Sequence, residues 1–388
     1  MELNHYPVKN KQKTILAVLS VFTCAAAATS FYFSSQMVQA WSQKPLGPVL
    51  ESSTPGQQLP ATWTVQPSAL PLSTITLAPT LGFATNTPFI LPPCYGLPPM
   101  TILAIGTDQR SDDYLYGHAD AIRVVRVDFL SRRVSVLEFP RDLWVEIPEI
   151  VDDIQQDHDK LNTAYFYGSP ALHIWDSPSQ GPGLLARTLE LNFGAKADHY
   201  IAVSMDVFVN LVDAIGGIDI DLAKEVDGRT YSDRSKRLYF PAGEQHLTGE
   251  QALTLGRIRN VSVFTRAKHQ DLVMCAVRKK MENVDVLAQM PQIISSFRNH
   301  IQTDLTPAQI SQLACLATSF PRNNILFASF PRELFKPSEA YEPVLKQNVF
   351  IWDADFNELT RYVEQFNAGS WPSPSTAAKP DPEISSCQ

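Results

Sequence analysis

The chain has 388 residues, of which 44% are apolar and 19% are charged, and its net charge at neutral pH is −8. This composition is typical of a packed globular protein. The negative charge disfavours a general nucleic-acid binder, so an anionic substrate would have to meet a local cluster of arginines.

The N-terminal region contains an uncharged apolar stretch from Thr14 to Ser34, preceded by lysines at positions 9, 11 and 13. Its length matches a membrane span, and the lysines place residues 1–13 in the cytoplasm and the rest of the chain outside. A cleaved secretory signal is the alternative, because Val38 to Ala40 offers a small-residue cleavage site. The apolar run exceeds the roughly 7 to 15 residues of a signal core, which favours a single-pass anchor at residues 14–34 in the cell membrane.

Residues 35–98 are rich in Pro, Ser, Thr and Leu and carry little charge. Such a segment cannot form a core and is expected to be an extended tether. Four of the five cysteines lie beyond the predicted span, without the spacing of a CxxC pair or a zinc site. We expect them to be core residues or to form one disulfide, which export permits.

Strand patterns dominate the next part of the chain. A continuous apolar run, MTILAIGTD, stops at a glycine and an acid, and AIRVVRVDF and RRVSVLEF form a predicted hairpin across the polar turn LSRR. Further strands are expected at DHYIAVS, IDIDL and NNILFASF. Helical periodicity separates these strands, in GPGLLARTLELNFG, MDVFVNLVDAIGG, TGEQALTLGRIRN, TRAKHQDLVMCAVRKKMENV and TPAQISQLACLATSF. In the third of these helices, Thr248 and Gln251 have the spacing of a capping box.

Strands interleaved with helices predict a layered α/β domain over residues 99–367, followed by a Pro/Ser-rich tail at 368–388. Charged residues gather where the predicted strands end: Asp108 after the first, Asp120 before the second, and Arg141 with Asp142 after the third. Ligands of open α/β sheets bind at such strand ends. Taken singly, each of these residues is also explained as an ordinary turn or cap residue.

Further cationic and polar side chains occur at Lys160, Arg257, Arg259, Arg266 and Gln270. Arg257 and Arg259 are two residues apart and can face one ligand only if the helix ends between them, whereas Arg266 and Gln270 share a helix face. Arginine binds phosphate in a bidentate manner, while carboxylates need a divalent cation to approach it. The combination therefore indicates Mg²⁺-assisted chemistry on a phosphate or pyrophosphate. A solvated basic helix face is the competing interpretation of each residue alone.

Seven blocks in this order resemble the LytR-CpsA-Psr family of cell-envelope proteins, over roughly Thr101 to Met281. GTDQR is similar to the family's G-[ST]-D-x-R, HADAIRVVRVD to its R-x-D-[TA]-[IM] strand, and FPRDLWVEIP to its I-P-R-D-x-x-V block. KLNTAYFYG is similar to K-[IL]-N-x-A-Y-x-Y-G, and the segment RTLELNFG to IDIDL resembles the family's central part. AGEQHLTGEQALTLGRIRN and TRAKHQ resemble its G-x-x-x-L-x-G-x-x-A-L-x-[YL]-x-R-x-R and G-R-x-x-R-Q blocks.

The resemblance implies a three-layer α/β/α enzyme with a central mixed sheet, anchored in the membrane and facing outward. Family members transfer a phosphoglycan from a polyprenyl-pyrophosphate carrier to a hydroxyl of peptidoglycan or another wall polymer. By this resemblance Asp108 and Asp120 would position Mg²⁺, with Mn²⁺ as an alternative. Pyrophosphate and head-group contacts would come from Arg141, Arg257, Arg259, Arg266, Gln270, Lys160 and His118. Asp120 or Asp142 would accept the proton of the acceptor hydroxyl, and the alternative role of Asp142 is to orient neighbouring arginines.

Two positions depart from the family pattern. His118 stands where the family has arginine, and His269 replaces the arginine of its R-Q pair. Each change exchanges a permanent cation for a side chain that is mostly neutral near pH 7. These replacements leave a non-catalytic glycan or lipid binder as one alternative to the transferase. Because water could replace the sugar hydroxyl, a metal-dependent pyrophosphatase acting on the same lipid carrier is the other.

Overall fold

The structure is a computed structural model. It describes residues 45, 47–50, 99–108, 117–258, 263–281, 301–306, 309–310, 313, 321, 324–342, 345–372 and 384–386. In this part of the chain, no helix combines the length and the apolar character that a membrane crossing requires. The predicted anchor at 14–34 and nearly all of the predicted tether lie outside these residues.

A mixed sheet forms the centre of the described molecule, with strand order β11-β6-β1-β2-β3-β12-β15. β1 is parallel to β6 and β3 is parallel to β12, whereas the other neighbours are antiparallel. The strand bounds are β1 Met100–Thr107, β2 Ala119–Asp128, β3 Arg133–Phe139, β6 His199–Ser204, β11 Ile301–Thr303, β12 Ile325–Ser329 and β15 Ile384–Ser386. The predicted mixed sheet and the hairpin of β2 and β3 are confirmed.

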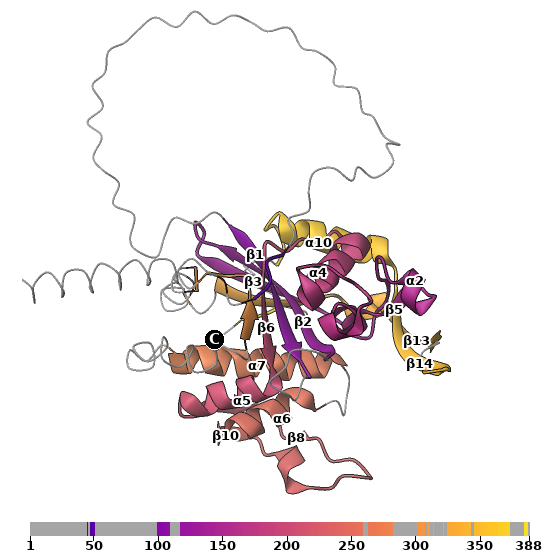
Figure 1. Cartoon of the computed structure of the whole chain (residues 1–388). Coiled ribbons are helices and arrows are strands. Elements are labelled where there is room, and N and C mark those ends of the chain that lie inside the picture. The colour runs from indigo at the N-terminus through magenta and orange to yellow at the C-terminus, as the bar shows by residue number, and fades with distance from the viewer. Residues whose placement is uncertain are drawn as a thin grey trace, which may run out of the picture.

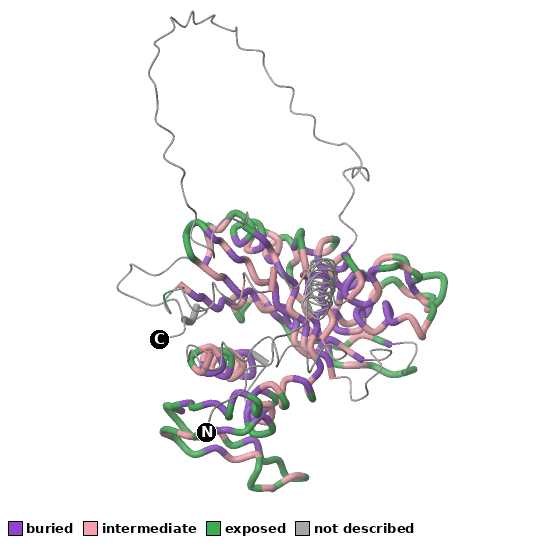
Figure 2. Tube along the Cα trace, turned by 60° about the vertical axis from the view of Figure 1, so that its left-hand side comes forward, coloured by how far each residue is buried: buried purple, intermediate pink, exposed green. Residues whose placement is uncertain are grey.

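Strand alternation divides the sheet residues between two cores. Leu103, Ile122 and Leu137 join the larger core, under α3, α4 and α10, whereas Ile102 and Val127 belong to a second core on the opposite face. In Figure 1 α4 and α10 lie on one side of the sheet, and α7, α5 and α6 lie on the other. Figure 2 shows that the central strands contain mostly buried residues, whereas exposed residues lie in the outer loops.

Four predicted helices, α4, α5, α6 and α7, begin and end close to their predicted boundaries, whereas α2, α3 and α10 were not predicted. The predicted helix TPAQISQLACLATSF lies mostly outside the described residues. The helix bounds are α2 Val151–Ile154, α3 Leu161–Tyr167, α4 Gln180–Phe193, α5 Met205–Ala214, α6 Gly249–Arg257, α7 Val263–Met281 and α10 Phe356–Asn367. The capping box of α6 is present, because the side chain of Thr248 accepts from the backbone of Gln251 and the side chain of Gln251 accepts in return.

Short paired strands surround the central sheet. β7 (Ile218–Leu222) pairs with β10 (Gly243–Leu247), and these two strands share a core with α5, α6 and α7. The other pairs are β4 (Trp144–Glu146) with β5 (His158–Lys160), β8 (Val226–Asp227) with β9 (Tyr239–Phe240), and β13 (Phe335–Glu342) with β14 (Gln347–Ala354). Single 3-10 turns occupy Pro170–Leu172, Lys236–Leu238 and Arg332–Leu334.

Candidate functional site

The end of the sheet at β1 and β2 contains a β-bulge that singles out Asp120. Gly106 pairs with Ala121 and Thr107 pairs with Ala119, so Asp120 has no partner residue on β1. A bulge changes the direction of a side chain and is common beside active sites. The sequence pattern did not reveal this bulge.

Asp108 lies at the same end of the sheet, directly after β1. Its carboxylate oxygen Oδ1 accepts a hydrogen bond from the backbone of His118 at 2.7 Å, and its own backbone N–H donates to the carbonyl of His118 at 3.2 Å. These bonds close the base of the segment 109–116, which is not described. Asp108 and Asp120 therefore lie at the same end of the β1–β2 pair, one after β1 and the other near the start of β2.

Arg141 connects Asp120 to a second carboxylate. Its guanidinium forms an ion pair with Asp120, and its Nε donates to Oδ2 of Asp142 at 3.4 Å. The other oxygen of Asp142, Oδ1, lies 3.6 Å from the Lys160 ammonium. Opposite charges thus alternate along Lys160, Asp142, Arg141 and Asp120. Because both oxygens of the buried Asp142 face cations, the geometry favours its predicted orienting role over a role as a base.

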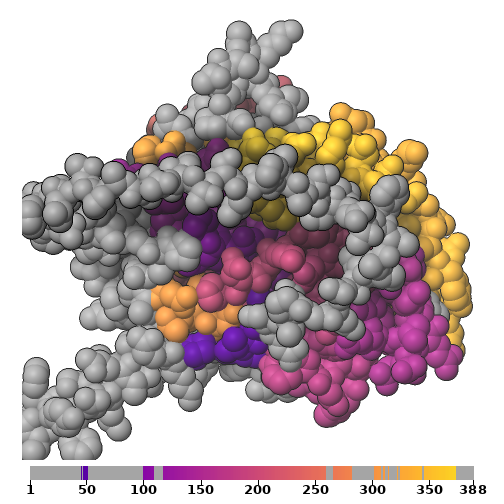
Figure 3. Space-filling view, turned by 90° about the horizontal axis from the view of Figure 1, so that it is seen from above, coloured from indigo at the N-terminus to yellow at the C-terminus, as the bar shows by residue number. Residues whose placement is uncertain are grey.

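The backbone on either side fixes this charged array. The carbonyls of Arg141 and Leu143 accept from Asn162 and Leu161 at the start of α3, at 3.1 and 2.8 Å. The carbonyl of Asp142 accepts from Trp352 of β14 at 2.8 Å. Figure 3 shows the C-terminal part of the chain, in yellow, beside the magenta region of the chain. Segments far apart in sequence therefore bind the backbone of Arg141 and Asp142.

The two histidines that depart from the family pattern occupy different environments. The ring of His118 stacks on Phe166 of α3, with 4.8 Å between ring centroids and 9° between ring planes. His269 lies on α7, where burial lowers the pKa of its imidazole. A lowered pKa keeps this ring neutral at pH 7, so position 269 contributes no cation there.

The remaining predicted residues lie around α6 and α7. Arg257 is exposed at the last position of α6, and Ile258 is already extended, so the helix ends where two arginines could share a ligand. Arg259 lies outside the described residues. Arg266 is buried, and Gln270 contacts Arg123 and the carbonyl of Gly256 rather than open solvent. The predicted ligand roles of these residues stay predictions.

The carboxylates at the sheet end suit a hard cation. Mg²⁺ is commonly bound through one or two carboxylates, with substrate phosphates and water completing the coordination. Asp108 and Asp120 supply that donor set, and each retains one oxygen, Oδ2, beyond the hydrogen bond or ion pair described above. Within the described residues, no three or more His, Cys, Asp or Glu side chains lie close enough together to hold a metal ion on their own. The residues therefore fit a cation held jointly with a phosphorylated substrate.

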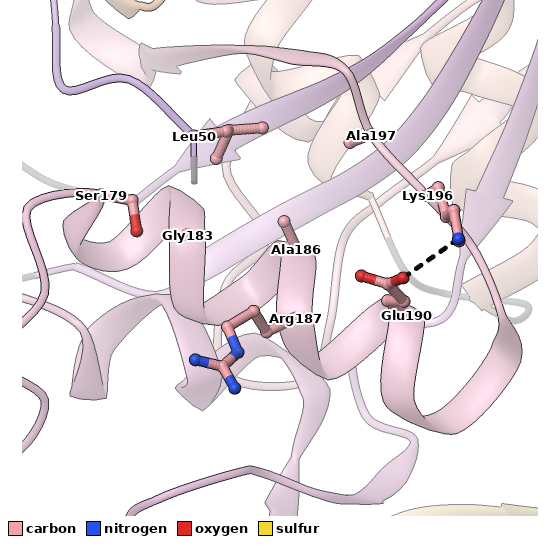
Figure 4. A pocket seen from close by; sticks show the side chains of 8 residues that line it. All are labelled: Leu50, Ser179, Gly183, Ala186, Arg187, Glu190, Lys196 and Ala197. Carbon is pink, nitrogen blue, oxygen red and sulfur yellow. Dashed lines mark ion pairs between the residues drawn. The ribbon is translucent and has the colours of Figure 1, made fainter. Parts of the chain in front are cut away.

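A solvent-open pocket runs along α4, away from this array (Figure 4). It is lined by Leu50, Ser179, Gly183, Ala186, Arg187, Glu190, Lys196 and Ala197. On one side of the pocket Lys196 forms an ion pair with Glu190 at 3.5 Å. None of the predicted site residues lines this pocket, and its charged wall does not suit a polyprenyl chain.

A buried charge cluster was missing from the sequence-based site. Arg123 of β2 contacts Glu138 of β3 at 3.3 Å and Asp271 of α7 at 2.6 Å. A signal existed, because the hairpin pairs Asp128 with Arg133 and counting back from the turn pairs Arg123 with Glu138. Two opposite charges inside apolar strands could have indicated this contact.

Comparison with known proteins supports the resemblance. The model of the LytR_cpsA_psr family matches residues 96–365. A teichoic acid transferase of Bacillus subtilis, TagV, named polyisoprenyl-teichoic acid–peptidoglycan teichoic acid transferase, is 28% identical over 210 residues, which cover 53% of this chain and 50% of TagV. The transferase TagU of Bacillus cereus, which has the same descriptive name, is 30% identical over 217 residues, covering 55% of this chain and 62% of TagU.

The crystal structure of B. subtilis TagV has the same fold, with a TM-score of 0.52 and 23% identity over 69% of this chain and 96% of that one. The sequence matches span only about half to three-fifths of the length of these transferases. The family match, by contrast, covers well over half of the present chain. The chain therefore belongs to the LytR-CpsA-Psr family.

Proposed function

We propose that this chain transfers a phosphoglycan from a polyprenyl-pyrophosphate carrier to a hydroxyl of peptidoglycan or another wall polymer. The observation that carries the proposal is the array of Lys160, Asp142, Arg141 and Asp120 at the sheet end, in a chain of this family. The names of TagV and TagU, which specify teichoic acid transfer to peptidoglycan, support the same substrate classes.

In the proposed reaction, the acceptor oxygen attacks the phosphorus that carries the glycan. The bond from that phosphorus to the bridging oxygen breaks, and its electron pair leaves with polyprenyl phosphate. A phosphodiester forms, and the acceptor proton passes to a base. We propose Oδ1 of Asp120 for this role, because it is released when Arg141 turns from it to the pyrophosphate, whereas Asp142 stays paired with Lys160. Such a transfer depends mainly on positioning and on neutralising charge.

Different residues of this chain would bind the cation and the pyrophosphate. Asp108 and Asp120 would hold Mg²⁺, which when bound would reduce the negative charge on the pyrophosphate oxygens. Arg141 would exchange part of its ion pairing for the pyrophosphate, with Arg257 and Arg259 as further donors and Lys160 beside them. We also propose that residues 14–34 anchor the chain in the membrane, where the lipid carrier resides.

Replacing Arg141 tests the proposal. Because arginine contacts to a transferring phosphoryl group act mainly in the transition state, Arg141→Met should lower kcat/KM for the lipid-linked donor by roughly 100- to 1,000-fold. Attachment of wall glycopolymer in cells should fall accordingly. The matched control is Arg126→Met on the same strand hairpin, since Arg126 pairs with Asp128 at 3.4 Å and takes no part in the array. Unchanged attachment with folded Arg141→Met protein would contradict catalysis by this site.

A further inference from the structure

A buried charge cluster lies between the central sheet and α7, next to the candidate site. Its hub is Arg123, whose two terminal nitrogens contact Asp271 at 2.6 Å, Glu138 at 3.3 Å and the side-chain oxygen of Gln270 at 3.1 Å. Arg123 is 8% exposed, and a guanidinium has the fixed fork needed to serve three acceptors on two elements at once. The cluster thus joins β2, β3 and α7.

The charges of the cluster are balanced. Burial raises the pKa of Glu138 and Asp271 raises it further, whereas the cations Arg123 and Arg266 lower it. Two arginines therefore face two carboxylates in the interior. Loss of one buried partner leaves an uncompensated charge, which is strongly destabilising. This balance explains how the chain accommodates these charges inside an otherwise apolar strand hairpin.

The orientation of the Gln270 amide follows from its two neighbours. Arg123 can only donate, so it requires the amide oxygen, and the carbonyl of Gly256 can only accept, so it requires the amide nitrogen. The nitrogen donates to that carbonyl at 3.1 Å. Both ends of the Gln270 side chain are thus committed to internal partners.

The carbonyl of Gly256 belongs to the last turn of α6, where backbone oxygens lack partners inside the helix. Its neighbour Arg257 is the final residue of α6, and Ile258 leaves the helical conformation. The Gln270 amide therefore caps the helix end from a neighbouring helix. Whatever fixes this amide also fixes the backbone from which Arg257 projects.

We propose that Arg123 is a positioning residue for the phosphate-binding arginines: it holds Gln270, which holds the end of α6 and thereby Arg257. This inference rests on the proposed function, because it assumes that Arg257 binds the donor pyrophosphate. Gln270 acts in it through the backbone of Gly256, a role separate from the head-group contact predicted for it, and the exchange measurement below reports this role alone. Arg123 itself never touches the substrate.

Three variants test the contacts that link Arg123 through Gln270 to the end of α6. Arg123→Met removes the hub, Arg123→Lys keeps the charge with a single ammonium in place of the fork, and Gln270→Leu removes the amide without creating an unpaired charge. Arg126→Met, an arginine of the same strand that pairs with Asp128, is the control. Hydrogen–deuterium exchange of residues 249–258 reports the helix end, and steady-state kinetics with a lipid-pyrophosphate-linked saccharide reports the site.

Exchange near Gly256 and Arg257 should accelerate by roughly 10-fold or more in Arg123→Met and Gln270→Leu, and less in Arg123→Lys. At a temperature well below unfolding, kcat/KM should fall by about 10- to 100-fold in the same order, because misplacing a binding group by about 1 Å has effects of this size. The control should change neither quantity. If Arg123→Met does not fold, Arg123→Lys and Gln270→Leu still decide the outcome.

Unchanged exchange at the end of α6 in Arg123→Lys and Gln270→Leu would overturn the proposal, whatever the activity. Faster exchange with unchanged kcat/KM would overturn it as well, since the contacts from Arg123 through Gln270 to Gly256 would then not affect binding or catalysis. A wild-type chain that exchanges as expected but transfers no glycan would instead refute the proposed function, and with it the role assigned to Arg257.

Discussion

Arg141 is held from several directions before any substrate arrives. Asp120 and Asp142 pair with its guanidinium, and the start of α3 binds its carbonyl. Side chains that are already oriented lose little freedom when a ligand binds, and they stabilise developing charge without reorganisation. The same pairing means that a phosphate must compete with Asp120, which a cation at Asp108 and Asp120 would make easier.

His269 should make the stability of the fold depend on pH. Burial lowers its pKa in the folded state, so below about pH 6.5 the unfolded chain binds a proton that the folded chain resists. His269 should therefore contribute a decrease in the free energy of unfolding as the pH falls from 7 to 5, opposite in sign to the contribution of His199, whose pKa is raised by its hydrogen bond with Asp304. His269→Gln should remove this contribution, so that the variant loses less stability than the wild type between pH 7 and 5, measured by urea unfolding at each pH.

The exposed His173 is the control for that experiment, because its side chain is 79% accessible. His173→Gln should retain the wild-type slope between pH 7 and 5. A slope that survives unchanged in His269→Gln would show that the burial of His269 does not control this titration.

Individual site residues were easier to predict than their contacts. Asp108, Asp120, Arg141 and Asp142 were singled out because charged residues interrupt apolar strands at their ends. The bulge at Asp120 was not predictable, because it depends on the register of β1 against β2. The burial of Arg266 and the engagement of Gln270 depend on how α7 packs against the sheet, which helical periodicity alone does not specify.

At the scale of elements, α6 carries a complete capping box at its first turn and the arginine of the site at its last. Thr248→Ala removes the side-chain oxygen that accepts from the backbone of Gln251, so the free energy of unfolding should fall by about 1 kcal/mol. Urea unfolding measures this change. The activity at low temperature should persist, because the opposite end of α6 is held by Gln270.

Thr254→Ala is the matched control, because it makes the same substitution within α6, away from its cap. It should leave stability unchanged or raise it slightly, since alanine has the higher helix propensity. Equal losses from both substitutions would show that the cap of α6 contributes nothing specific.

Elements with strong periodicity were predicted, including β1, β2, β3, α5 and α6. The hairpin of β13 and β14 was not, because FKPSEAYE contains a proline and several charges and resembles a loop. It contributes to the site a backbone hydrogen bond from Trp352 to Asp142, between residues 210 positions apart in the sequence. Local patterns carry no information about such a contact.

At the scale of the whole molecule, the chain is expected to cross the membrane once and to function outside the cytoplasm. Cys275 of α7 is disulfide-bonded, which suits an oxidising compartment. The intact mass of the protein purified from membranes distinguishes an anchor from a cleaved signal. We predict that residues 1–40 are retained, whereas a mature chain beginning after Ala40 would identify a signal peptide.

The proposed transfer of a phosphoglycan to peptidoglycan can be tested by identifying the reaction products. Purified full-length protein in detergent is incubated with Mg²⁺, a lipid-pyrophosphate-linked saccharide and peptidoglycan, and the products are identified by mass spectrometry and phosphorus NMR. We predict a phosphodiester between saccharide and peptidoglycan, with polyprenyl phosphate released in equal amount, and loss of both products in Arg141→Met. Free phosphate-terminated saccharide without an adduct would show a pyrophosphatase instead, and binding without either product would show that the chain is not an enzyme of this reaction.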